Sequence, residues 1–520
     1  MSRYPTNQRP STSLSMAGLW TLVGVASLLL LGSIQALPPN DLWWHVRIGS
    51  DILDSGYIPR HDIYSLTEQG RPFFYQSWLA EVLMAGLLRL GGLRLLVFIR
   101  ALIMTGLFGT VMILCWWASG GDRRAAIPAT LSAILLGVSN QTLRPQLFAY
   151  PLFITIYALL WRYRRGQGRQ SVWLIPVLTA VWVNVHGSFA LGVGLIWLIF
   201  LGELLSYALP ALGGRRAPMQ IQAHTRLRTL GLVALLSTVA LLINPRGVGV
   251  AGYVTNLLGS TPVQALAFEW QPPSPTDGLG VLFYPILLFL FAVLALARPP
   301  VALTDLLVVL AFAWLAASGL RHVVWFGLVS APILAEALLR LPREDLRRWR
   351  DRLACHPFGR RLIYGDASGY PGFRRIAVAS AIVFLLVPAI LFLFYPDDDL
   401  WLTNNTGKAA VDFMEQNGIQ GRLFNELARG SYLIWRLGAA QPVFIDPRFE
   451  LYSLEHFETY LTLSKAEGDV AALLAEYDFE LLLLDREWQA PLVEFVDGQP
   501  EHWRRVYEDD YTLLYRRVGE

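Results

Sequence analysis

Long apolar runs recur along most of this chain, and they constrain its fold more than any other feature. A helix that crosses a membrane needs about 20 apolar residues, and several runs reach or approach that length. Charged residues make up only 16% of the sequence, against about 25% in a soluble protein. The sequence therefore predicts an α-helical polytopic membrane protein with about 11 transmembrane helices. The candidate spans are 16–37, 93–118, 126–143, 147–161, 171–185, 188–209, 229–243, 279–297, 301–319, 323–339 and 376–395.

The placement of arginine predicts how these spans are oriented. Arginine-rich connectors alternate with connectors that carry few basic residues, and positively charged connectors stay on the cytoplasmic side. We expect a multi-pass protein of the cytoplasmic (inner) membrane, with a cytoplasmic N-terminus and an extracytoplasmic C-terminal domain. The run at 16–37 is long enough to be a retained first helix rather than a signal peptide. The connectors that carry arginine on the cytoplasmic side are 123–124, 162–169, 215–228, Arg298 and 340–375.

The end of the chain has a different pattern, with ordinary polarity and short strand-like runs. We expect a transmembrane domain at 1–395 and a soluble extracytoplasmic α/β domain at 396–520, which is a normal domain size. A helix is predicted at 406–417, ending at Gly418. Strands are predicted at 421–425, 442–446, 480–485, 503–507 and 511–517.

The first outer loop, residues 38–92, is longer than a plain connector and unusually rich in carboxylates, histidines and aromatic residues. Its apolar spacing predicts an amphipathic helix that ends at Gly56 and lies along the membrane surface. Trp43 and Trp44 suit the headgroup zone there. Residues 78–90 are apolar but too few to cross, so we expect a helix at the interface.

Two carboxylates and a histidine in this loop are candidates for catalysis. Asp41 is the first carboxylate after the first span, and it is either a helix N-cap or a general base or metal ligand at a cavity mouth. His45 lies one turn later, on the same face if Asp41 begins the helix. Asp62 follows Pro59 in an extended segment, and it either caps the next turn or supplies a second site carboxylate.

Short connectors on the predicted outer side carry a repeated set of arginine and histidine residues. Snorkelling to the surface explains one such arginine, but the outer side should hold few basic residues. Guanidinium groups bind phosphate in a bidentate manner, so we favour a phosphate site. Its candidate residues are Arg144, His186, Arg246, Arg321 and His322. Glu269, in a neighbouring loop, is either a substrate contact or a solvated carboxylate.

The C-terminal part has one comparable group of charged residues. Asp446 and Arg448 follow the predicted strand at 442–446, and ligands of α/β domains often bind at the carboxyl ends of strands. The alternative is an internal salt bridge between the two side chains, which we favour.

The loop segment 41–65, DLWWHVRIGSDILDSGYIPRHDIYS, together with Trp78 and Glu81, resembles the GT-C superfamily of membrane glycosyltransferases. The similarity is to the bacterial branch related to protein O-mannosyltransferases and the lipid A aminoarabinose transferase. An acidic residue after the first span, a long outer loop and a soluble tail form the shared pattern. The usual adjacent acid pair is Asn40-Asp41 here, and the connector 144–146 has no acid.

The resemblance implies an inverting glycosyltransferase with a polyprenyl-phosphate-linked sugar as donor. A glycan, lipid or protein would be the acceptor, and membrane lipid would surround the helices. Asp41 would deprotonate or orient the acceptor hydroxyl, and the outer arginines and histidines would hold the phosphate. A divalent cation, Mg or Mn, is a candidate cofactor, with Asp41 as its ligand. Asp446, Arg448 and Glu269 would contact the acceptor.

Two other classes of function remain open. A lipid or polysaccharide transporter should show internal repeats and charges at the membrane midplane, and this sequence shows no repeat. A non-catalytic envelope assembly protein is the other alternative. The net charge of +3 gives no reason to expect a nucleic-acid partner.

Overall fold

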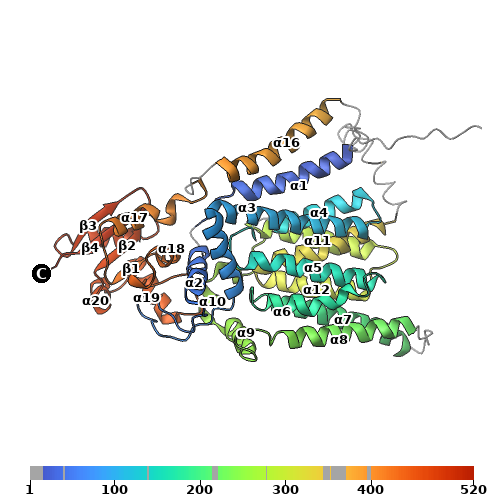
Figure 1. Ribbon diagram of the computed structural model, residues 1–520, viewed down its shortest axis with the longest axis horizontal. Helices are drawn as coiled ribbons and strands as arrows, with labels where there is room; N and C mark the ends of the chain where they lie inside the picture. Colours follow the sequence, from blue (N-terminus) through green and yellow to red (C-terminus); the bar gives the residue numbers. More distant parts are fainter. Residues whose placement is uncertain are drawn as a thin grey trace, which may run out of the picture.

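A bundle of long helices forms one part of the molecule, and a smaller α/β part packs against one end of it (Figure 1). The computed structural model describes residues 16–38, 41–137, 140–212, 221–276, 278–342, 352, 371–394 and 400–519. The predicted domain boundary at 395/396 and Asn40 lie outside these residues. We refer to residues 400–519 as the C-terminal domain.

Each predicted span contains a helix. Within the described residues, four helical segments are long enough and apolar enough to cross a membrane: Trp78–Ala118, Phe189–Leu209, Leu320–Leu339 and Arg374–Phe394. The chain is therefore a membrane protein, while the number of 11 spans remains a prediction. The helices are α1 (Met16–Ile34), α3 (Trp78–Ala118), α4 (Arg123–Gly137), α5 (Gln146–Arg164), α6 (Ile175–Trp182), α7 (Phe189–Leu212), α8 (Ile221–Ala240), α11 (Gly280–Leu296), α12 (Leu303–Ser318), α13 (Val323–Leu339) and α16 (Pro371–Phe394).

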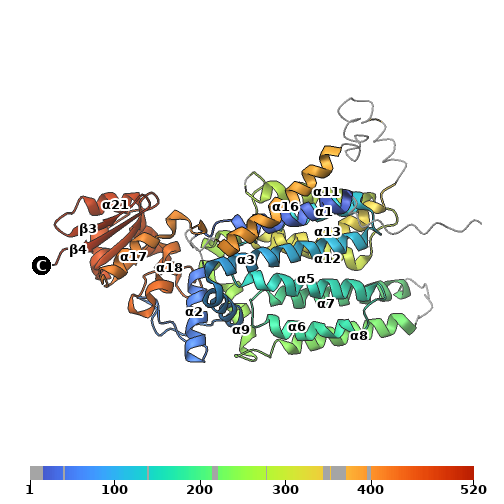
Figure 2. The ribbon, with the colours of Figure 1, turned by 45° about the horizontal axis from the view of Figure 1, so that its top comes forward.

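At one edge of the bundle, the first and the last helix of the membrane part lie side by side. Helix α16 lies along α1, as both views show (Figure 2). Two short helices, α9 (Gly249–Gly259) and α10 (Thr261–Leu266), lie at the end of the bundle that faces the C-terminal domain.

The first outer loop folds largely as predicted. Helix α2 (Leu42–Ser55) ends at Gly56, whose φ of 76° is the left-handed conformation that glycine adopts easily. Helix α3 kinks at Gly91 and Gly92, so its first part corresponds to the separate helix predicted at 78–90. Its position at a membrane interface remains a prediction.

The C-terminal domain holds a four-stranded sheet with the order β1-β2-β4-β3, in which only β1 and β2 are parallel. The strands are β1 (Leu423–Asn425), β2 (Leu481–Asp485), β3 (Trp503–Glu508) and β4 (Thr512–Arg517). The helices around it are α17 (Lys408–Gln416), α18 (Leu427–Leu437), α19 (Leu454–Ser464), α20 (Val470–Glu476) and α21 (Ala490–Asp497).

The strand predicted at 442–446 is wrong. Only Val443 makes bridges, one to Leu423 and one to Ser65 of the first loop. The side chain of Asn425 takes the place of a ladder: its Oδ1 accepts from the Phe444 N–H at 2.8 Å, and its Nδ2 donates to the Ile445 carbonyl at 2.8 Å. These side-chain bonds satisfy the segment's buried backbone without a strand partner.

The C-terminal domain and the first loop interlock. The Val443 N–H donates to the Tyr64 carbonyl at 2.9 Å, and the Leu66 N–H donates to the Val443 carbonyl at 2.8 Å. The Trp43 ring is 2% exposed and packs on Tyr432 and Trp435 of α18. The predicted headgroup position of Trp43 is therefore wrong, because α18 covers its ring, and the Trp44 ring lies in a cavity lining instead.

Candidate functional site

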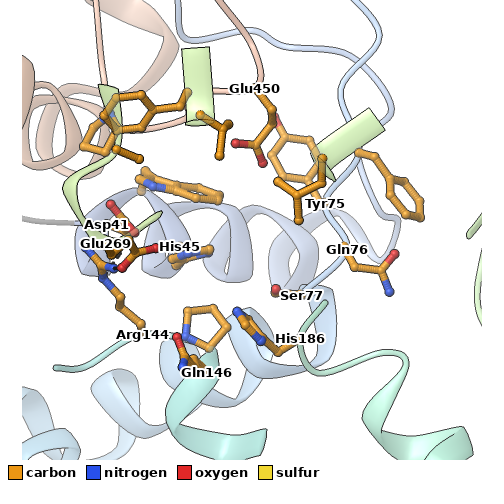
Figure 3. A pocket seen from close by; sticks show the side chains of 18 of the residues that line it. Asp41, His45, Tyr75, Gln76, Ser77, Arg144, Gln146, His186, Glu269 and Glu450 are labelled. Atoms are coloured by element: carbon orange, nitrogen blue, oxygen red, sulfur yellow. Dashed lines mark hydrogen bonds and ion pairs between the residues drawn. The ribbon is translucent and has the colours of Figure 1, made fainter. Parts of the chain in front are cut away.

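A cavity of about 360 Å³ lies between the end of the helical bundle and the C-terminal domain (Figure 3). Segments far apart in the sequence line it, and all of them belong to connectors that were predicted to face one side of the membrane. They are α2 and the residue before it, the loop 73–77, Glu81, residues 144–146, His186, several residues between Tyr253 and Trp270, Arg321, and Pro447, Phe449 and Glu450. The fold thus gathers the predicted outer connectors around one hollow.

A chain of alternating charges runs along one side of this cavity. Arg144 lies between two carboxylates, with its Nε 3.2 Å from Asp41 Oδ2 and its Nη1 2.7 Å from Glu269 Oε2. The Nη1 of Arg321 lies 3.7 Å from the other Glu269 oxygen. Figure 3 shows Asp41, Glu269 and Arg144 together at one edge. Glu269 is therefore paired with both arginines, while its side chain remains 39% exposed.

Asp41 does not act as a helix cap. It precedes α2, but its side chain accepts no capping hydrogen bond. Burial raises the pKa of Asp41 from its usual value and outweighs the opposing effect of Arg144. For Glu269 the balance is reversed, because Arg144 and Arg321 overcome the effect of burial and lower its pKa.

His45 also lines the cavity, one turn along α2 from Asp41. Its Nδ1 lies 2.8 Å from Glu81 Oε1 of α3, and the side chains of both residues are buried. The ring lies against Trp44, with centroids 3.5 Å apart and the ring planes tilted by 31°. Burial lowers the pKa of His45, and the positive charges of Arg144 and Arg448 act in the same direction.

The remaining predicted phosphate ligands divide into two groups. His186 lines the cavity, its Nδ1 is 2.8 Å from Ser188 Oγ, and burial together with Arg321 lowers its pKa to about 3. Arg246 and His322 do not line the cavity. The Arg246 guanidinium lies over the Phe74 ring, 3.1 Å from its centroid, and His322 packs edge-on against Trp270.

Asp62, Asp446 and Arg448 form a buried network outside the cavity lining. Arg448 donates to Asp62 and binds both oxygens of Asp446, at 2.8 and 2.7 Å. The second Asp62 oxygen accepts from the Ser65 N–H at 2.9 Å and the Ser65 hydroxyl at 2.6 Å. Asp446 and Arg448 thus form the internal salt bridge that the sequence suggested, and Asp62 also pairs with Arg448. The structure places all three in the joint between the first loop and the C-terminal domain, away from the cavity.

Two carboxylates at the cavity were missed as site residues. Glu81 was assigned to an interfacial helix, although its place three residues after Trp78 was already a notable feature. Glu450 comes from the C-terminal domain, and its carboxylate points into the cavity in Figure 3. Burial raises its pKa. Its position just after Asp446-Pro447-Arg448 was the only signal in the sequence.

The charges at the cavity do not fit a divalent cation. Among the residues that the structure describes, no group of three or more His, Cys, Asp or Glu side chains could hold a metal ion. The guanidinium of Arg144 lies between the two nearest carboxylates, Asp41 and Glu269. We therefore derive no step through a metal.

Solved structures resemble this chain over nearly its full length. No protein-family model and no curated protein matches it. The oligosaccharyltransferase of Archaeoglobus fulgidus, in the apo form, matches with a TM-score of 0.53 and 14% identity, over 96% of this chain and 74% of that one. ArnT from Cupriavidus metallidurans, bound to undecaprenyl phosphate, matches with a TM-score of 0.51 and 15% identity, over 97% and 99%. Both are GT-C glycosyltransferases, so the chain has the GT-C fold that the first-loop resemblance predicted.

Proposed function

We propose that this protein is a membrane glycosyltransferase. It moves a sugar from a polyprenyl-phosphate-linked donor to an acceptor on the outer face of the cytoplasmic membrane. One observation carries the proposal: on a GT-C fold, a single cavity at the end of the bundle collects Asp41, His45, Arg144, His186 and Arg321 from four separate connectors. ArnT was solved with undecaprenyl phosphate, and the archaeal enzyme AglB with dolichol-phosphate.

The two cavity arginines suit the phosphate of such a donor. Glu269 holds both of them at the cavity, and a guanidinium group has five donors. Arg144 donates from Nη1 to Glu269, while its Nε lies 3.2 Å from Asp41 without a hydrogen bond in the described residues. Positive charge fixed in place before the reaction stabilises the phosphate that leaves with its lipid. Arg246 and His322 lie outside the lining, so this role falls to Arg144, His186 and Arg321.

Asp41 faces the same cavity and forms an ion pair with Arg144. It deprotonates or orients the acceptor hydroxyl, which attacks the anomeric carbon opposite the lipid phosphate, so the product has inverted configuration. The acceptor enters along the side formed by Pro447, Phe449 and Glu450 of the C-terminal domain. That position gives the domain a part in choosing the acceptor.

Transfer from a labelled polyprenyl-phosphate sugar, measured with purified full-length protein in lipid, tests the proposal. Asp41→Asn keeps the size of the side chain and removes its charge. We expect transfer to fall by about 10²-fold or more, the range for a group acting in the transition state, with an unchanged melting temperature. Asp54→Asn is the matched control, because Asp54 is on the same helix with a side chain 66% exposed. Full activity of Asp41→Asn would end the claim for this residue.

A further inference from the structure

The pair of His45 and Glu81 is held by an unusually close approach of two helices. At Gly49 of α2, an added Cβ would lie 2.0 Å from the carbonyl oxygen of Glu81 on α3. Only a glycine permits that distance. The contact brings Glu81 beside the His45 ring, where Nδ1 and Oε1 are 2.8 Å apart. Glycine at this position therefore serves the pairing of the two side chains.

The surroundings of the ring leave one nitrogen for the cavity. When Glu81 is ionised, its carboxylate only accepts hydrogen bonds, and the proton of the neutral His45 ring then lies on Nδ1. The Trp44 ring fixes the plane of the imidazole from one side. Nε2 is then an acceptor, and it has no hydrogen bond to any described residue. His45 lines the cavity and is labelled there in Figure 3.

Glu81 itself is not arranged as a structural carboxylate. It is 0% exposed, and its Oε2 has no partner within the described residues. An unsatisfied buried carboxylate oxygen is destabilising and calls for an explanation. Asp446, by contrast, has both oxygens bonded. Glu81 therefore contacts His45 with one oxygen and leaves the other unpaired. This arrangement is expected of a carboxylate that positions the ring.

We propose that His45 accepts the proton of the acceptor hydroxyl through Nε2, and that Glu81 is the residue that positions its ring. This inference rests on the proposed function and deepens it, since it assigns the base to His45 and leaves Asp41 to orient the acceptor. The acceptor oxygen forms the new bond to the anomeric carbon. The bond from that carbon to the phosphate oxygen breaks, and the lipid phosphate leaves with its electron pair. The hydroxyl proton ends on Nε2, and Glu81 stabilises the resulting imidazolium.

The charges around the ring suit a base that starts neutral. Arg144 and His186 face it from the bundle, Arg448 from the C-terminal domain, and Glu81 from α3. The pKa of His45 lies well below its usual value, so the ring is unprotonated at neutral pH. The same shift makes it a weaker base, so proton transfer depends on Glu81 to stabilise the imidazolium.

Chemical rescue distinguishes a base from a structural residue. We expect purified His45→Ala to bind labelled donor as the wild type does and to lose transfer by about 10²–10⁴-fold. Added imidazole should restore part of the rate, because the free base can occupy the space left by the ring. Rescue should grow with the basicity of substituted imidazoles. His502→Ala is the control, because the His502 side chain is 67% exposed. Its rate should equal that of the wild type and should not change when imidazole is added.

Two further variants keep the proposal open to refutation if His45→Ala misfolds. His45→Gln retains a donor for Glu81 but is not basic, so it should fold, bind donor and fail to turn over. Glu81→Gln should lower kcat less than the loss of His45, with KM little changed. A wild-type rate in His45→Gln, or a folded His45→Ala that binds donor yet shows no rescue, overturns the proposal. If the wild type itself transfers no sugar, the proposed function fails first.

Discussion

Two clusters of arginine and carboxylate side chains in this protein use the same chemistry in opposite ways. In the cavity, Arg144 bridges Asp41 and Glu269, and the Arg144 side chain is 27% exposed. In the joint between the first loop and the C-terminal domain, Arg448 bridges Asp62 and Asp446, and all three side chains are 0% exposed. The difference lies in what surrounds each group.

The joint cluster is saturated. Ser65 and Tyr452 donate to its carboxylates in addition to Arg448, so the loss of water is matched by hydrogen bonds. It also ties together residues 386 positions apart in the sequence. In the cavity cluster, the guanidinium groups of Arg144 and Arg321 line the cavity. A saturated cluster holds two parts of the fold together, whereas an unsaturated one can bind a ligand.

The largest effect should come from breaking the joint. Arg448→Met leaves two buried carboxylates without their counter-charge, and removal of one partner of a buried pair costs about 3–5 kcal/mol. We expect a large drop in the melting temperature of the purified protein, or no folded protein at all. The matched variant Arg144→Met changes a side chain that is 27% exposed, so its melting temperature should stay near that of the wild type. Equal melting temperatures for the two variants would show that the clusters do not differ as described.

The next largest effect should be on donor binding, which depends on the arginines of the cavity cluster. Arg144→Ala and Arg321→Ala each remove charge-assisted hydrogen bonds to phosphate, worth about 1.5–3 kcal/mol, or roughly a 10- to 150-fold loss of affinity. The measurement is a titration of each variant with labelled polyprenyl phosphate.

Arg246→Ala is the control for this titration, because Arg246 is exposed and packs over Phe74, outside the lining. It should bind nearly as well as the wild type. A loss in Arg246→Ala as large as that in Arg144→Ala would return Arg246 to the phosphate site.

Local pattern was enough to predict what depends on nearby residues. Hydropathy located the helices, the apolar spacing and Gly56 located α2, and the bias of arginine placed Arg144, His186 and Arg321 on one side with Asp41. Contacts between distant segments were not readable. The aromatic belt rule assigned Trp43 to the membrane surface, because nothing in the sequence indicates that α18 covers it. Glu450 reached the cavity by the same kind of long-range packing, and so did the partnership of Asp62 with Arg448.

The two clusters should also respond to acid at different pH values. Burial acts to raise the pKa of Asp62, but Arg448 and Ser65 lower it below its usual value. A carboxyl group whose folded pKa is depressed adds stability above the unfolded pKa of about 3.9, and that stability is lost as the pH falls through the folded pKa. Asp41 has a raised pKa and should protonate at a higher pH. Because Asp41 acts on the acceptor, we therefore expect the rate of transfer to fall on acidification before the melting temperature falls. The Asp62→Asn variant should show a flatter dependence of melting temperature on pH below about 4.

The smallest effect concerns the start of α2. There a side chain from α18, and not Asp41, accepts a hydrogen bond from the first turn of the helix. Asp41 caps nothing, and the Trp44 N–H in the first turn donates instead to Ser431 Oγ of α18, at 3.0 Å. Loss of a helix cap costs about 0.5–2 kcal/mol, so Ser431→Ala should lower the melting temperature by a few degrees, while Ser431→Thr should restore most of it. Asp41→Ala should not lower it through loss of a cap. If Asp41→Ala destabilises the protein and Ser431→Ala does not, the helix is capped from within the loop, and the contact with α18 contributes nothing to holding α2 in place.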